Sequence, residues 1–347
     1  MAREKRFIRS KSVYELCMRV RQDLPFPCRV QITLLLKSAM ARANRDGRVT
    51  ICHFIWLGNH LHILLVVWDP NDCKKFYCEL QKKITEYMKS LRGMSHYIMW
   101  EGRPMVAAVI KKEDVPSRII YFYQNPAAVD LVENINDYPG LSSWQDFLSA
   151  DSLQSKITHE VPWVHAPDVQ RLPSEFISSK LDLQRTVELE EKCRRRRNKK
   201  KAAAAAKGIK LDKEPEMEEL VVEPNAWAKC FGLDDDEVKK INAGIIQCIV
   251  DTEQSLSELR KKEGRTVIGG YRLTQQQFFK PHIPKKNGTK IFVICSDEKD
   301  RAKFIAMVKR LSAECTELYR QRIFHTWPPG MFRPPAPPHA SALPMLH

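Results

Sequence analysis

The stretch from Ile51 to Trp68, ICHFIWLGNHLHILLVVW, constrains the fold of this chain more than any other part of the sequence. Its two halves are rich in β-branched and aromatic residues, and a Gly-Asn pair separates them, which is typical of a β-hairpin. Because successive side chains of a strand point to opposite faces, His60 and His62 share one face and Leu61 points to the other. The sequence therefore predicts two antiparallel strands that carry a histidine pair inside an apolar run.

The segments around this hairpin predict an α+β domain. A strand is expected before the hairpin, near residues 13–21, and a helix over residues 29–45, where apolar residues recur at helical spacing. After the hairpin we expect a helix from 69 to 92, an extended segment within 97–110 and a helix within 113–133. The order β-α-β-β-α-β with one further helix is the ferredoxin-like (RRM-like) pattern, in which helices cover one face of an antiparallel sheet.

The length of 347 residues is enough for more than one structural unit. We expect the α+β domain to occupy residues 1–150, and a basic helical linker to follow over 151–224. A smaller C-terminal α/β region of unknown function is expected over 225–326. Residues 327–347 are rich in proline and predict a disordered tail.

Positive charge is in excess along the chain. Lys and Arg number 57 against 42 Asp and Glu, which gives a formal net charge of +15. Such an excess favours a polyanionic partner, above all nucleic acid, although a basic solvated surface is the alternative. The densest run, Arg194 to Lys201, predicts a clamp on a duplex stem; the alternatives are a solubilising helix face or a flexible charged linker.

The cysteines and the N-terminus bear on where the protein works. The chain has 10 cysteines and no C-x-x-C pair, which favours reduced thiols over a disulfide framework. No stretch approaches the roughly 18 apolar residues of a membrane span, and the basic N-terminus is not followed by an apolar segment. We therefore expect a soluble, cytoplasmic protein with no membrane partner.

The stretch YFYQNP, Tyr121 to Pro126, indicates a chemical role for the histidine pair. Two imidazoles on one face of a strand can hold one metal ion. On a helix, Tyr121 and Asn125 are four residues apart and share a face, so a phenol nucleophile and a third oxygen ligand approach the same point. The alternatives are two structural histidines and an ordinary aromatic residue at the boundary of an amphipathic helix.

Several motifs in this order resemble those of one known family. They are N-H-x-H before three apolar residues (Asn59 to Leu65), W-x-G/R-R (Trp100 to Arg103), Y-x-x-x-N-P (Tyr121 to Pro126), L-V (Leu131-Val132) and Y-P with S-S (Tyr138-Pro139, Ser142-Ser143). Together they resemble the REP-associated tyrosine transposases, a branch of the HUH single-strand endonucleases. The resemblance covers about residues 10 to 150.

The resemblance implies a role for each site residue. His60, His62 and Asn125 would be ligands of a divalent metal, Mg²⁺ or Mn²⁺, and Tyr121 would be the nucleophile. Mn²⁺ suits imidazole ligands and Mg²⁺ is more abundant. Zinc is less favoured because no cysteine stands near the pair in a ligand pattern, although His53 leaves that question open.

The resemblance also implies a substrate and a reaction. The protein would be a metal-dependent endonuclease and strand transferase that acts on single-stranded or hairpin DNA, through a 5′-phosphotyrosine intermediate, as a monomer or a homodimer. The positions of Arg103, Lys111 and Lys112 near the motifs make them candidates for DNA binding. Where the family usually has Arg, this chain has Ala128, which removes one expected DNA contact.

Two other functions stay open. A domesticated protein could keep this fold and bind structured DNA or RNA without cutting it. A replication or conjugation initiator nickase would use the same chemistry, but the chain has no G-x-x-x-x-G-K-[ST] loop of the kind that accompanying helicases carry.

Overall fold

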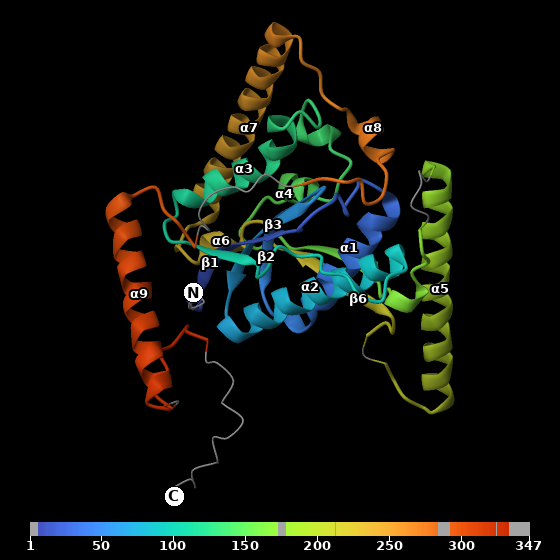
Figure 1. Ribbon diagram of the computed structural model, residues 1–347, viewed down its shortest axis with the longest axis horizontal. Helices are drawn as coiled ribbons and strands as arrows, with labels where there is room; N and C mark the ends of the chain where they lie inside the picture. Colours follow the sequence, from blue (N-terminus) through green and yellow to red (C-terminus); the bar gives the residue numbers. More distant parts are fainter. Residues whose placement is uncertain (1–5, 173–177, 212, 284–291, 324, 333–347) are drawn as a thin grey trace, which may run out of the picture.

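A five-stranded sheet lies at the centre of the molecule (Figure 1). The computed structural model describes residues 6–172, 178–211, 213–283, 292–323 and 325–332. The strand order is β2-β3-β1-β4-β7. The strands are β1 (Ser12–Arg19), β2 (Thr50–Leu57), β3 (His60–Val67), β4 (Met105–Val109) and β7 (Val293–Ile294). The first four pair antiparallel, as the βαββαβ pattern predicts, which confirms the α+β class.

The register of the sheet determines which side chains meet the histidines. In the β2–β3 hairpin, Ile55 is opposite His62. On the other side of β3, Cys17 of β1 is opposite His62 and Arg19 is opposite His60. Since directly opposed residues share a face of the sheet, alternate residues of β1 line the same face as the histidine pair.

One face of the sheet is covered by α1 (Val30–Ala43) and α2 (Pro70–Arg92), as the sequence predicts. The ends of α2 follow from single residues. The side chain of Asp69 accepts hydrogen bonds from the backbone of Asn71 and Asp72, and Gly93 ends the helix with a left-handed φ of 64°. These signals explain why both boundaries of α2 can be predicted from sequence.

The opposite face is covered as well, by α3 (Asp114–Ala128), α4 (Trp144–Leu148), α6 (Ala226–Lys229) and α7 (Asp235–Glu263). The ferredoxin-like pattern alone does not include this second helical layer. Buried Arg260 of α7 holds the layer together, because its guanidinium donates to the carbonyl of Ala127 at 3.0 Å and pairs with Glu133 at 2.6 Å. As a result, α3 is fixed between the sheet and α7.

The rest of the chain adds to this body. A two-stranded sheet joins β5 (Ile157–Pro162) and β6 (Met217–Val222). The remaining helices are α5 (Ser179–Ala206), α8 (Gly270–Thr274) and α9 (Glu298–Arg320), with short 3-10 turns at Arg45–Gly47, Ile135–Asp137 and Ala166–Asp168. None of the helices in the described ranges has the length and apolar character needed to cross a membrane.

The C-terminal part of the chain lies against the N-terminal sheet. Strand β7 pairs parallel with β4 at the sheet edge, and α7 packs on α3. The domain boundaries drawn from sequence at 150, 224 and 326 stay a prediction. Of the predicted disordered tail, Met331 forms a bridge with Phe7, and residues 333–347 lie outside the described part of the chain.

Candidate active site

His60 and His62 lie side by side at the start of β3. Their ring centroids are 5.1 Å apart and the rings are nearly perpendicular, at 84°. The side chain of His62 is buried, with 5% of the residue exposed, whereas His60 is half-buried at the hairpin turn. The structure therefore brings the two predicted histidines together at the rim of the core.

The two rings are oriented in the same way by oxygen partners. His62 donates from Nδ1 to Oε1 of Glu15 at 2.7 Å, and His60 donates from Nδ1 to Oδ1 of Asn59, also at 2.7 Å. Each ring thus keeps its Nε2 for another partner. In the described part of the chain, the buried Nε2 of His62 has no hydrogen-bond partner.

Glu15 is the centre of a charged network. It is fully buried on β1, and Arg118 of α3 donates to both of its carboxylate oxygens, from Nε at 2.7 Å and from a terminal nitrogen at 3.0 Å. Burial alone would raise the pKa of Glu15, but the hydrogen bonds and charges of His62 and Arg118 lower it below its usual value. Glu15 is therefore ionised and holds two cationic groups in place.

The pKa values of the two histidines move in opposite directions. Burial lowers the pKa of His62, but Cys17 and Glu15 outweigh this effect and raise it to about 9. For His60, burial and the charges of His62 and Arg19 lower the pKa to about 3. The pair therefore combines one neutral imidazole with one imidazole that is charged in the metal-free protein.

Tyr121 extends from α3 toward the histidine pair. The ring centroid of Tyr121 is 5.4 Å from that of His62, at an interplanar angle of 88°. The guanidinium of Arg118 lies 4.3 Å from the Tyr121 ring centroid. Tyr121 is 42% exposed, so part of the residue faces solvent. Burial raises the pKa of Tyr121, and the charge of Arg118 opposes that rise.

Asn125 lies one helical turn after Tyr121 on α3 and is half-buried. Within the described ranges its side chain makes no hydrogen bond, and its role as a third ligand stays a prediction. No group of three or more His, Cys, Asp and Glu residues that could hold a metal occurs among the described residues. A metal at this site would therefore need an amide or water oxygen beside the two imidazoles.

Three residues at the site were not predicted from the sequence: Glu15, Cys17 and Arg118. The first two share a strand face, as their spacing of two residues indicates, but only the pairing of β1 with β3 places that face beside His62. Arg118 precedes Tyr121 by one helical turn, and this spacing was a usable signal.

The predicted DNA-binding residues differ in their surroundings. Arg103 and Lys112 are exposed and form no ion pair within the described residues. Lys111 lies between two carboxylates at the start of α9, 3.2 Å from Asp297 and 2.7 Å from Asp300. Its charge is therefore partly offset within the protein, and DNA contact by all three residues stays a prediction.

His53 does not join the pair. It is fully buried on β2, where its Nδ1 and the hydroxyl of Tyr123 are 2.8 Å apart, and it is opposite Leu64 rather than either site histidine. Burial lowers the pKa of His53 to about 3. Its contacts are those of a core residue.

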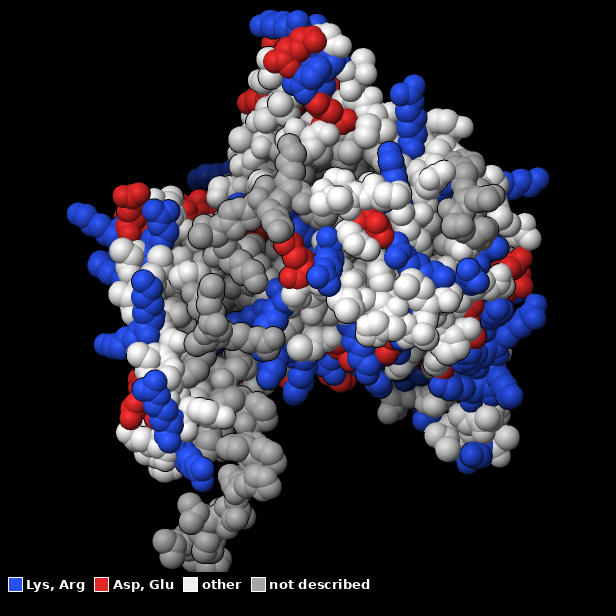
Figure 2. All heavy atoms as spheres, viewed as in Figure 1, with Lys and Arg blue, Asp and Glu red and all other residues white. Residues whose placement is uncertain are grey.

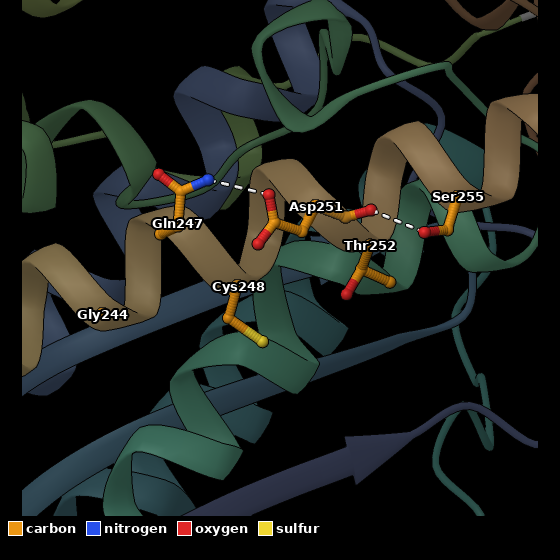
Figure 3. Close-up of a pocket in the computed structure, with 6 residues that line it drawn as sticks. All are labelled: Gly244, Gln247, Cys248, Asp251, Thr252 and Ser255. Carbon is orange, nitrogen blue, oxygen red and sulfur yellow. Dashed lines mark hydrogen bonds between the residues drawn. The ribbon is translucent and has the colours of Figure 1, made fainter.

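A shallow recess of about 450 Å³ lies elsewhere, on α7 (Figure 3). It is lined by Gly244, Gln247, Cys248, Asp251, Thr252 and Ser255, all from one helix. None of these is a predicted site residue and none is basic. The recess is therefore separate from the histidine pair in composition and in position along the chain.

The densest basic run lies on the second half of α5, where Lys and Arg gather at the lower right of Figure 2. Much of its charge is met by acidic neighbours. Arg196 is 2.6 Å from Asp168, Lys200 pairs with Glu216, and Lys201 pairs with Glu214. The run is helical, as predicted, and part of its positive charge is balanced at close range.

Comparisons with known proteins add little to this geometry. No family model matches the chain, and no curated protein sequence does. A solved structure described as a REP-associated tyrosine transposase bound to a REP hairpin covers 43% of this chain and 86% of its own, at 19% identity and a TM-score of 0.37. A likeness at this level does not define an activity.

The fold and site define an α+β protein whose sheet presents a histidine pair to a tyrosine on the covering helix.

Proposed function

We propose that this protein is a metal-dependent endonuclease and strand transferase on single-stranded or hairpin DNA, with Tyr121 as its nucleophile. One observation carries the proposal: the exposed Tyr121 packs against His62, whose buried Nε2 has no partner among the described residues. A phenol nucleophile beside imidazole nitrogens that could hold a divalent ion suits attack on a phosphate.

The chain's own residues fit a divalent metal. A ligating histidine commonly donates its other ring nitrogen to a carboxylate or carbonyl oxygen, as His62 does to Glu15 and His60 to Asn59. The Nε2 atoms of both rings would hold the ion, with Asn125 as the oxygen ligand. Two imidazoles and oxygen ligands suit Mn²⁺ or Mg²⁺. Such an ion supplies charge that polarises the scissile phosphate.

The reaction follows from the groups on α3. The oxygen of Tyr121 forms a bond to the scissile phosphorus and loses its proton. The bond from phosphorus to the 3′ oxygen breaks, and that oxygen takes up a proton as a free 3′-hydroxyl. Arg118, stacked on the Tyr121 ring, favours the phenolate. Attack by a 3′-hydroxyl on the phosphotyrosine reverses the step and joins strands.

A second candidate is a domesticated protein that binds structured DNA or RNA without cutting it. The network of Glu15, His62 and Arg118 favours this candidate, because both cationic groups already share a carboxylate partner in the absence of a metal. Under either candidate the protein acts as a monomer or a homodimer in the cytoplasm near the nucleoid.

The test uses labelled hairpin oligonucleotides with single-stranded extensions, incubated with Mn²⁺ or Mg²⁺ and run on a denaturing gel. We expect a covalent protein–DNA species that Tyr121→Phe abolishes and the matched control Tyr271→Phe, at an exposed tyrosine of α8, leaves unchanged. An adduct that survives in Tyr121→Phe contradicts the choice of nucleophile. Hairpin binding without any adduct in the unaltered protein supports the non-cutting binder.

A further inference from the structure

A segment from the C-terminal region lies at the end of the sheet that carries the histidine pair. We call residues 275–283 the strap; it follows α8 and leads back across the central sheet (Figure 1). The strap pairs with the segment after β1, since the backbone of Leu24 donates to the carbonyl of Lys280 at 2.9 Å and that of Asp23 to His282 at 2.7 Å. More than 250 residues of sequence separate these partners.

The segment after β1 also contacts the turn that carries His60. The backbone of Val20 donates to the carbonyl of Asn59 at 2.9 Å, and that of Phe26 donates to Gly58 at 3.1 Å. The strap is therefore fixed one chain segment away from the start of β3, at the end of the sheet where the histidine pair lies.

A third segment meets the same end of the sheet. The backbone of Arg21 donates to the carbonyl of Met99 at 2.8 Å, and that of Glu101 donates to Arg19 at 3.0 Å. Arg103 follows Glu101 by two residues. Three parts of the chain that are remote in sequence thus border the site together.

The strap is anchored by its aromatic residues. The guanidinium of Arg29 lies 5.1 Å from the ring centroid of buried Phe278, and that of Arg92 lies 4.1 Å from the centroid of Phe279. Arg92 also pairs with Asp23, in the segment that the strap contacts. These contacts hold the strap in place and leave the side chains after Phe279 exposed.

Three cations are exposed at this end of the sheet. Arg21, Arg103 and Lys280 are all exposed, and in the described ranges none of them forms an ion pair. The basic run of α5 differs, because acidic side chains meet it. Positive charge without an ion-pair partner beside the candidate site favours binding of a nucleic-acid backbone, since each neutralised phosphate releases counterions.

We propose that Arg21, Arg103 and Lys280 form one surface that binds the phosphates of the single DNA strand entering the histidine site. The inference rests on the proposed function for its substrate. It gives the strap, and through it the C-terminal region, a role in holding the nucleic acid. The partner is single-stranded DNA rather than duplex, because the surface borders the scissile position.

The test measures DNA binding in a Tyr121→Phe background, so that no cutting occurs. The variant Arg21→Ala/Arg103→Ala/Lys280→Ala is compared with Lys299→Ala/Lys309→Ala/Arg310→Ala, which removes the same charge from exposed positions of α9. Each binds a hairpin with a single-stranded extension and the same hairpin without one, over a range of salt concentrations. Thermal unfolding of both variants checks that they are folded.

For the site variant we expect the dissociation constant for the extended hairpin to rise about tenfold or more, and the slope of log affinity against log salt to fall in magnitude by about 2, three contacts at about 0.7 each. The α9 variant should keep the slope of the parent. Unchanged affinity and slope in the site variant, or an equal loss for the blunt hairpin, overturn the inference.

The two proposals fail separately. Binding does not depend on cutting, so a chain that binds through this surface and forms no adduct contradicts the endonuclease alone. A chain that forms the adduct but binds equally well without the three cations contradicts the surface alone. If the parent binds neither oligonucleotide, both proposals are wrong.

Discussion

Two histidine–tyrosine pairs lie in the same layer between the sheet and α3. In the first, His53 Nδ1 and the hydroxyl of Tyr123 are 2.8 Å apart. In the second, the rings of His62 and Tyr121 are 5.4 Å apart, nearly perpendicular. The residue types are the same and both tyrosines come from α3, although His53 lies on β2 and His62 on β3; the pairs also differ in burial and charge.

In the first pair, the tyrosine hydroxyl is buried and hydrogen-bonded. Tyr123 is fully buried, its hydroxyl also lies 3.0 Å from Oγ of Ser143, and burial raises its pKa far above the usual value. In the second pair, Glu15 and Arg118 supply charge, and the Tyr121 hydroxyl makes no hydrogen bond within the described residues. A buried, neutral pair whose tyrosine hydroxyl is hydrogen-bonded supports the core, whereas a charged pair with a partly exposed tyrosine is available for chemistry.

The largest expected difference between the pairs is in adduct formation. Tyr121→Phe should lower the rate of covalent adduct formation at least about 10³-fold, because it removes the nucleophile, and should leave stability nearly unchanged. Tyr123→Phe should keep the adduct and lower the free energy of unfolding by about 1 to 3 kcal/mol, because it leaves buried polar atoms unpaired. Gel analysis of the adduct and urea unfolding measure the two effects. Equal loss of adduct in both variants would remove the distinction between the pairs.

A smaller effect is expected from the carboxylate that distinguishes the second pair. Glu15→Gln keeps an acceptor for His62 but removes the charge that Arg118 binds, so adduct formation should fall about 10- to 100-fold and require more Mn²⁺. The control Glu133→Gln changes a carboxylate that pairs with Arg260, away from the site, and should leave the metal dependence unchanged. A metal titration of adduct formation measures this. Full activity in Glu15→Gln contradicts the role of the network.

Glu253 is a buried carboxyl group that behaves in the opposite way to Glu15. At Glu253, the effect of burial on the pKa outweighs that of the favourable charges nearby. Its pKa rises to about 7, from an ordinary 4.5. The folded protein therefore holds this proton more tightly than the unfolded chain, and the contribution of Glu253 to stability falls as pH rises from about 4.5 to 7. Glu253→Gln should be more stable than the parent by about 1 to 2 kcal/mol at pH 8 and no more stable at pH 4. Urea unfolding at both pH values tests the sign.

The smallest effect is expected at Lys111. Because Asp297 and Asp300 already offset its charge, Lys111→Ala should weaken hairpin binding less than Arg103→Ala does. Binding titrations of the two variants at one salt concentration compare them. A greater loss in Lys111→Ala would show that the ion pairs with α9 open when DNA binds.

Local signals predicted much of this fold and part of the site. Strand alternation placed His60 and His62 together, and helical spacing placed Tyr121 and Asn125 on one face of a helix, without showing that this face meets the histidines. Neither rule could find Glu15, because its position depends on the pairing of β1 with β3, or assign His53 to the core. The strap was beyond reach for the same reason: the pairing of Leu24 with Lys280 joins segments that carry no common sequence pattern.

The central claim is that Tyr121 attacks DNA at the histidine pair, and peptide mapping of the covalent species tests it most directly. The protein is incubated with an extended hairpin and Mn²⁺, digested with protease and nuclease, and examined by mass spectrometry. The account predicts a nucleotide on Tyr121 that is absent when the metal is chelated and absent in His62→Ala. A nucleotide on Tyr123 or another residue, or a modified Tyr121 that forms equally well without metal, would contradict it.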